Sequence, residues 1–148
     1  MKAIIITIGD ELLKGNTIDS NAHWLAKQLF SRNIKVISLI TIGDNKKSII
    51  DTISKNLKVN YDLIIITGGL GPTHDDITRH SLSSLFKSPI IFLEERHNML
   101  INKYKKNGKK IKLDQSQSKI LEVSKPIENN YGSALGMHIN HHNSDIVI

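Results

Sequence analysis

The sequence predicts an α/β fold: a three-layer sandwich with a mostly parallel sheet and helices on both faces. Short β-branched runs alternate with segments of helical periodicity along most of the chain, and this alternation is typical of βαβ units. The run Leu63–Thr67 is almost entirely isoleucine. A strand of that kind suits the centre of a parallel sheet, where both of its faces are buried.

The first half of the chain supplies strands and helices in alternation. They are expected, in order, at Ala3–Ile8, Ala22–Phe30, Lys35–Ile42, Ile49–Leu57 and Leu63–Thr67. Polar residues stand where the two helices should begin. Asp19 or Ser20 is expected to cap the first helix, and Asp44 or Asn45 the second.

The second half is less regular. Helical spacing predicts a third helix over about residues 76–85 and a fourth over 93–106. Two short strands, Met137–Ile139 and Asp145–Ile148, are expected on either side of the turn-like segment NHHNS. Because the sequence stops within an apolar run, we expect residues 1–148 to be a single domain that is truncated at its C-terminus.

Composition narrows the class of protein. Hydrophobic residues make up 39% of the chain and charged residues 23%, as in soluble globular domains. There is no cysteine, which fits a reducing cytosol, and no apolar run approaches membrane-spanning length. The net charge of +6 comes largely from six lysines between Asn102 and Lys112. Only Tyr104 interleaves with them, so we interpret the run as a solvated helix end and expect no nucleic-acid partner.

Glycine and acidic residues recur after each predicted strand of the first half. The loops GDELLKGNTIDSN (9–21), IGDN (42–45) and TGGLGPTHDD (67–76) all leave the carboxyl ends of strands, where parallel sheets bind their ligands. Asp10, Asp44, Asp75 and Asp76 are therefore expected to lie on one rim. Each acid could instead be an ordinary cap or loop residue, but three such coincidences are harder to accept than one shared site.

The combination of glycines and carboxylates predicts a phosphorylated ligand with a divalent cation. Gly68, Gly69 and Gly71 precede the third helix, so their backbone can approach an anion at a helix N-terminus. Carboxylates would repel that anion unless a cation lay between them, and Mg²⁺ typically uses one or two carboxylates together with substrate phosphates. The segment is neither a Walker A loop nor a dinucleotide fingerprint, since the required lysine and third glycine are missing.

The histidines are weaker candidates for metal ligands. His74 and His80 are interpreted as local hydrogen-bonding residues, and the group His138, His141 and His142 as a surface loop, because no fourth metal ligand stands beside it.

The motifs GDELLKGNTIDSN, TIGDN and TGGLGPTHDDITR resemble the N-terminal, molybdopterin-binding-like domain of the competence/damage-inducible CinA proteins, a relative of MoaB, MogA and MoeA. The resemblance is close from Ile4 to about Phe86. It continues more loosely at NNYGSALGM (129–137), where Leu135 replaces the proline of the family's Asn-x-x-Gly-x-Ala-Pro-Gly turn.

The resemblance implies a function and a set of site residues. In CinA proteins the corresponding domain is described as a metal-dependent ADP-ribose pyrophosphatase. Asp44 and Asp76 match the functional acids of the MogA-like relatives and are therefore expected to be catalytic. The expected metal ligands are Asp10, Asp44, Asp75 and Asp76, for Mg²⁺, Mn²⁺ or Co²⁺. The expected ligand-binding residues are Asn21, Thr67, Gly68, Gly69, Gly71 and Thr73.

Two other functions stay open. The MoaB- and MogA-like relatives bind or adenylate molybdopterin, which could be the ligand here, and a non-catalytic module that binds a nucleotide or a partner chain would use the same rim. The resemblance also implies a homo-oligomer, either a dimer or a trimer, and a small-molecule nucleotide or pterin as the bound partner. No membrane association is expected.

Overall fold

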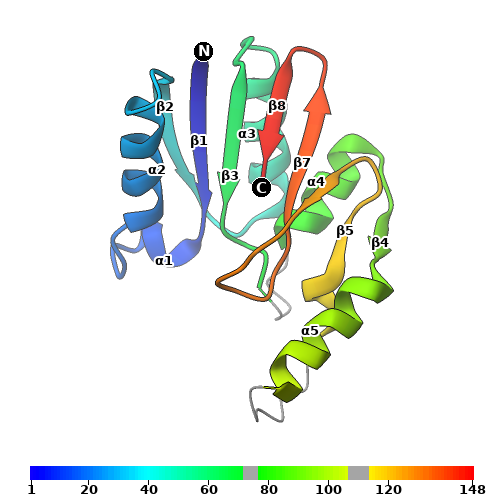
Figure 1. The fold of residues 1–148 in the computed structure, drawn as a ribbon. Helices are drawn as coiled ribbons and strands as arrows, with labels where there is room; N and C mark the ends of the chain where they lie inside the picture. The colour runs from blue at the N-terminus through cyan, green and yellow to red at the C-terminus, as the bar shows by residue number, and fades with distance from the viewer. Residues whose placement is uncertain (72–76, 107–113) are drawn as a thin grey trace.

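The structure, a computed structural model, describes residues 1–71, 77–106 and 114–148 (Figure 1). Its main sheet has six strands in the order β2-β1-β3-β8-β7-β6. These strands are β1 (Lys2–Ile8), β2 (Lys35–Ile42), β3 (Leu63–Thr67), β6 (Lys125–Ile127), β7 (Gly136–His141) and β8 (Ser144–Val147). Neighbours among β1, β2, β3 and β8 are parallel, whereas β7 is antiparallel to both β8 and β6. The predicted mostly parallel sheet is thus confirmed.

Helices cover both faces of this sheet. The described helices are α1 (Asp10–Leu13), α2 (Ser20–Phe30), α3 (Lys46–Leu57), α4 (Ile77–Phe86) and α5 (Glu94–Lys106), with a short 3₁₀ helix, η1 (Gln115–Ser118). Of these, α2 packs on one face and α3 and α4 on the other. Asp19 caps α2 by accepting from the Ala22 amide, and Asn45 caps α3 by accepting from the Ser48 amide. Each cap is one of the two residues that the sequence offered for it.

Alternate residues of β1 serve two separate hydrophobic cores. Ile4, Ile6 and Ile8 pack with residues of α3 and α4 on one face. Ala3 and Ile5 point the other way and pack with α2. A strand buried on both faces needs an apolar run without alternation, and this requirement explains the isoleucine-rich segments of β1 and β3. The predicted three-layer sandwich follows from these two cores.

A smaller lobe extends from the sheet beyond α4. Within it, β4 (Ile90–Phe92) pairs antiparallel with β5 (Lys119–Leu121), and η1 and α5 lie beside them (Figure 1). The sequence predicted α5 to within a residue but missed β4, β5 and β6. Each of these strands has only three residues, which is too short to display a period of two.

No helix within the described ranges is long and apolar enough to cross a bilayer.

Candidate functional site

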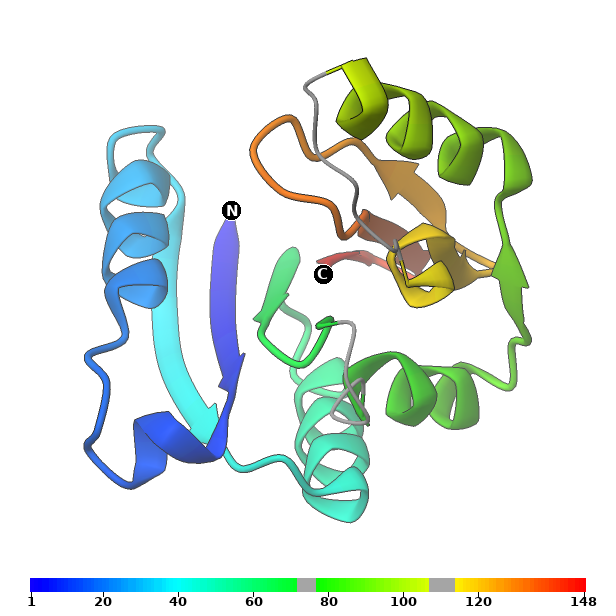
Figure 2. The ribbon, with the colours of Figure 1, turned by 90° about the horizontal axis from the view of Figure 1, so that it is seen from below.

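The carboxyl ends of β1, β2 and β3 form one edge of the sheet, which Figure 2 shows from below. At this edge Thr7 of β1 pairs with both Thr41 of β2 and Thr67 of β3. The three loops that the sequence singled out leave the sheet here. We call residues 9–14 and 43–45 the paired loops and residues 68–71 the glycine loop.

Two aspartates join the paired loops. The Asp10 amide donates to Oδ2 of Asp44 at 3.0 Å, and the Asp44 amide donates to Oδ1 of Asp10, also at 3.0 Å. A carboxylate that accepts from a backbone N–H makes a charge-assisted bond, stronger than a neutral one. The expected convergence of Asp10 and Asp44 therefore takes a specific form, in which each side chain caps the other's backbone.

Gly43 makes this close approach possible. A Cβ atom added at Gly43 would lie 2.5 Å from Oδ1 of Asp10, the oxygen that accepts from Asp44. On its other side Asp10 faces a cation, since Nζ of Lys14 lies 3.9 Å from Oδ2. Both side chains of this pair are more than half exposed, so the ion pair adds little stability. Its effect is to place a positive charge beside the carboxylates.

Two glycines of the glycine loop lie in close contact with neighbouring segments, where an added side chain would clash. Gly68 has a φ of +100°, and an added Cβ would lie 2.0 Å from the carbonyl oxygen of Ile8 at the end of β1. At Gly69, with a φ of +66°, the Cβ would lie 2.1 Å from Oγ1 of Thr78. That hydroxyl donates to the Gly68 carbonyl at 3.1 Å. The loop is thereby fixed between the end of β1 and the first turn of α4.

Arg79 places a buried positive charge in that same turn. Its side chain is 0% exposed, although Arg79 is only two residues into α4 and follows Thr78 directly. A fully buried guanidinium is costly unless it is paired. Arg79 has an interaction partner within the fold. Arg79 was not among the predicted site residues, although it ends the motif TGGLGPTHDDITR.

A fourth loop at this edge was also missed. Residues 128–135, which we call the β6–β7 loop, connect two antiparallel strands whose ends pair through Ile127 and Gly136. Because β7 is antiparallel to β8, its first residues lie at the carboxyl edge of the sheet. The segment NNYGSALGM was noted for its resemblance, but only the pairing of β6 with β7 places it on the rim (Figure 1).

The structure describes only part of the predicted site set. Asp10, Asp44, Thr67, Gly68, Gly69 and Gly71 lie on the rim. Thr73, Asp75 and Asp76, together with His74, lie outside the described residues. Asn21 lies in the first turn of α2 and is exposed, on the opposite side of the sheet from α4. No hydrogen bond within the described part of the chain joins Asn21 to the paired loops or the glycine loop.

The donor chemistry of the paired loops fits a hard divalent cation. Asp10 and Asp44 each use one carboxylate oxygen on a backbone amide. Oδ1 of Asp44 is left for another partner, and Oδ2 of Asp10 faces Lys14, which a cation bound there would have to displace. Mg²⁺ is commonly held by one or two carboxylates plus phosphate and water oxygens. No group of three or more metal-ligating side chains occurs in the described ranges, so these two carboxylates would need oxygens from elsewhere.

The rings of His141 and His142 lie edge to face with centroids 4.4 Å apart, whereas His138 has a separate partner. Nε2 of His138 lies 2.8 Å from Oδ1 of Asp145, and this contact holds the pKa of Asp145 below its ordinary value. His141 packs edge-on against Phe86, with ring centroids 5.4 Å apart. Burial, followed by the nearby charge of His142, lowers the pKa of His141. His138 and His141 belong to β7, so the interpretation of these histidines as a surface loop was wrong for two of the three.

Known proteins are similar to this chain over nearly its whole length. Residues 4–148 match a family model described as "Probable molybdopterin binding domain". A CinA-like protein of Thermosipho melanesiensis is 36% identical over 136 residues, which are 91% of this chain and 34% of that protein. A CinA-like protein of Flavobacterium psychrophilum is 37% identical over 147 residues, covering 97% of this chain and 35% of that one. The chain spans only about a third of the length of these two relatives.

Solved structures agree with the sequence matches. The protein CinA from Thermoplasma acidophilum superposes with a TM-score of 0.84 at 30% identity, covering 99% of this chain and 86% of that one. MoaB from Thermus thermophilus superposes with a TM-score of 0.63 at 14% identity and shares the fold alone.

Proposed function

Because this chain belongs to the CinA-type branch of the molybdopterin-binding-domain family, we propose that it is a metal-dependent hydrolase of a nucleotide pyrophosphate such as ADP-ribose. The observation that carries the proposal is the reciprocal pair of hydrogen bonds between Asp10 and Asp44. These bonds bring two carboxylates from separate loops to the rim on which the glycine loop also lies.

The reaction would add one water across the P–O–P bridge. The oxygen of the water bonds to one phosphorus, the bridging oxygen leaves with the other, and ADP-ribose yields AMP and ribose 5-phosphate. Such a transfer depends mainly on positioning and on stabilising negative charge. Gly69 and Gly71 would offer backbone N–H groups to the diphosphate.

The carboxylates would meet the other requirement, which is a binding site for the cation. Asp10 and Asp44 would hold the cation through the oxygens that their mutual bonds leave unused, and Asp75 and Asp76 would add further oxygens. A divalent metal bound there neutralises phosphate charge and lowers the pKa of an attacking water. Lys14 limits the repulsion between the carboxylates before the ligand arrives.

The test is release of AMP from ADP-ribose with Mg²⁺, Mn²⁺ or Co²⁺. We expect turnover by the wild-type protein and a loss of at least about 100-fold in Asp44→Asn and Asp76→Asn, exceeding the usual effect of outer-shell partners of a metal. Asp44→Asn keeps an amide oxygen for the Asp10 N–H and removes only the charge. Asp51→Asn, on the exposed face of α3, makes the same chemical change away from the rim and should leave turnover intact.

Two results would refute the hydrolase proposal. One is the absence of AMP release with every metal tested. The other is full turnover in both Asp44→Asn and Asp76→Asn, because the carboxylate charges would then be dispensable.

A pterin is the second candidate ligand, and the description of the matching family favours it. The same glycine loop would receive the phosphate of molybdopterin. Tight binding of molybdopterin, without any hydrolysis of ADP-ribose, would support this function instead. A non-catalytic module predicts thermal stabilisation by nucleotide with no product formed.

A further inference from the structure

The β6–β7 loop carries a fully exposed aromatic ring at its tip. Tyr131 is 104% exposed, so its side chain is as open to water as in an extended peptide. A single exposed apolar side chain is common on protein surfaces and needs no explanation by itself. Tyr131 differs in three respects: the hydrogen bonds that hold its backbone, the hollow beside its ring, and the position of its loop on the rim.

A rigid turn holds the Tyr131 backbone. Oδ1 of Asn129 accepts from the amides of Tyr131 at 3.0 Å and of Gly132 at 2.8 Å, and Nδ2 of Asn129 donates to the Ala134 carbonyl at 3.2 Å. One half-buried side chain thus fixes both sides of the tip. An added Cβ at Gly132 would lie 2.8 Å from Nδ2 of Asn129, so a side chain at position 132 would press on the amide that holds the turn.

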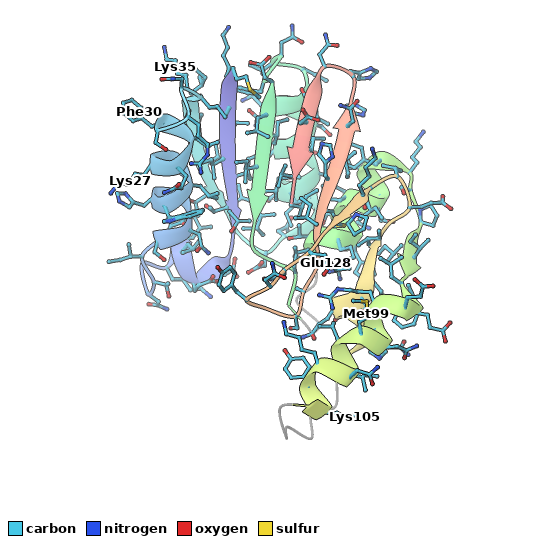
Figure 3. The ribbon with its side chains drawn as sticks, viewed as in Figure 1. Lys27, Phe30, Lys35, Met99, Lys105 and Glu128 are labelled. Carbon is cyan, nitrogen blue, oxygen red and sulfur yellow. The ribbon has the colours of Figure 1, made fainter. Side chains whose placement is uncertain are left out.

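The loop is also anchored to α5. Nε of Arg96, a residue only 9% exposed, lies 2.9 Å from Oε2 of Glu128. Further along the helix, Nζ of Lys103 lies 3.5 Å from the Asn130 carbonyl. Figure 3 shows Glu128 beside α5, with Lys105 labelled near the end of that helix. The loop therefore stands beside the basic end of α5.

A hollow of about 270 Å³ opens at the base of the ring. Its lining is Ile127, Glu128, Asn129, Asn130, Tyr131 and Gly136. Small-molecule sites commonly start at about 300 Å³, so this hollow suits one flat ring system rather than a whole nucleotide. Its walls supply an apolar side chain, an aromatic ring and amide groups, which are the features that recognise a heterocyclic base.

We propose that Tyr131 and this hollow form the subsite for the planar base of a nucleotide ligand whose phosphates lie on the same rim. The inference rests on the proposed function for the nature of the ligand. The ring of Tyr131 stacks on the base, the amide side chain of Asn130 meets its polar edge, and Lys103 adds a positive charge nearby. Tyr131 is a specificity residue and takes no part in the chemical step.

The experiment compares two probes that differ by the base: AMP and ribose 5-phosphate. Calorimetric titration of the whole chain should give a lower Kd for AMP. Loss of a stacking aromatic weakens nucleotide binding by roughly 5- to 150-fold. We expect Tyr131→Ala to weaken AMP by that factor and to leave ribose 5-phosphate unchanged, whereas Tyr131→Phe keeps both affinities. In turnover of ADP-ribose, Tyr131→Ala should raise KM with little change in kcat.

Phe30→Ala is the matched control, because Phe30 is also highly exposed, at 81%, and lies on α2 far from Glu128 (Figure 3). Three results would each overturn the base subsite: equal loss of AMP affinity in Phe30→Ala, equal weakening of both probes by Tyr131→Ala, or no preference of the wild type for AMP.

The experiment also separates the two proposals. If the wild type binds AMP through Tyr131 but hydrolyses nothing, the subsite stands and the hydrolase proposal fails. If turnover is present but insensitive to Tyr131→Ala, the hydrolase proposal stands and the subsite fails.

Discussion

The paired loops are held by each other, whereas the tip of the β6–β7 loop is held by a side chain of the loop itself, Asn129. Asp10 and Asp44 exchange hydrogen bonds across 34 positions of sequence. The three hydrogen bonds of the Asn129 side chain all stay within five residues. The first arrangement can form only after β1 and β2 have paired, while the second is an Asx-type turn available to the local chain. The rim thus combines a carboxylate pair that depends on the sheet with a turn that does not.

The largest loss of stability is expected for a substitution in the glycine loop, at the point where this loop contacts the end of β1. Gly68→Ala would place a Cβ atom 2.0 Å from the Ile8 carbonyl oxygen at a φ of +100°, so the backbone must move. We expect the free energy of unfolding to fall by about 3 kcal/mol or more. Urea denaturation measures this quantity.

Gly15→Ala provides the matched control for Gly68. Gly15 also has a positive φ, +71°, but nothing lies within 4 Å of an added Cβ. Only the left-handed conformation should cost free energy there, about 1 kcal/mol. Equal losses in the two variants would mean that strain, and not the contact with β1, sets the requirement for glycine at position 68.

The second effect tests the bond between the paired loops. Asp44→Ala leaves the Asp10 amide without its acceptor and should lower the free energy of unfolding by about 1–2 kcal/mol. Asp44→Asn keeps an acceptor oxygen and should lose less than half of that amount. The comparison uses urea denaturation in the absence of metal. Similar losses in the two variants would show that the charge of Asp44, and not its geometry, joins the loops.

The third effect concerns the β6–β7 loop. Asn129→Ala removes two accepted bonds and one donated bond and should cost about 1 kcal/mol, since the loop is largely exposed to competing water. Asn129→Asp keeps both accepted bonds and should cost less. Hydrogen exchange of the Tyr131 and Gly132 amides reports the loop directly. Because the loop is locally held, exchange at Asp10 and Asp44 should not change, and a change there would show that the two regions are coupled.

The smallest effect on stability is expected at the opposite edge of the sheet, at His141, the last residue of β7. Since burial lowers the pKa of His141, the unfolded chain binds a proton there at a higher pH than the folded chain. Stability should therefore fall as pH drops through the ordinary histidine value of about 6.5, and the loss should level off below the folded pKa. His141→Gln should flatten this part of the pH profile of thermal unfolding. AMP affinity in the same variant should match that of the wild type.

Part of the site could be read from local sequence. The strand boundaries at Lys35–Ile42 and Leu63–Thr67, the caps at Asp19 and Asn45, and the position of Asp10 and Asp44 after their strands all follow from patterns a few residues long. The carboxyl edge then follows from the rule that parallel strands end on the same side.

The rest of the fold and of the site depends on contacts between residues that are far apart in the sequence. Nothing local distinguishes β4, β5 and β6, because three residues carry no period and each strand exists only through its partner. Arg79 looked like an ordinary polar residue of a helix, yet its side chain is completely buried in the folded chain.

By itself, the sequence determined the alternation of strands and helices, the parallel centre of the sheet and the three acidic, glycine-bearing loops at its carboxyl edge. These depend on hydrophobic period and backbone preference, which act over a few residues. Only the tertiary structure decided that Asp10 and Asp44 bond to each other's amides, and that Tyr131 stands on the same rim. The physical reason is that both outcomes require strands far apart in sequence to pair first, and the distances between their loops are set by that pairing.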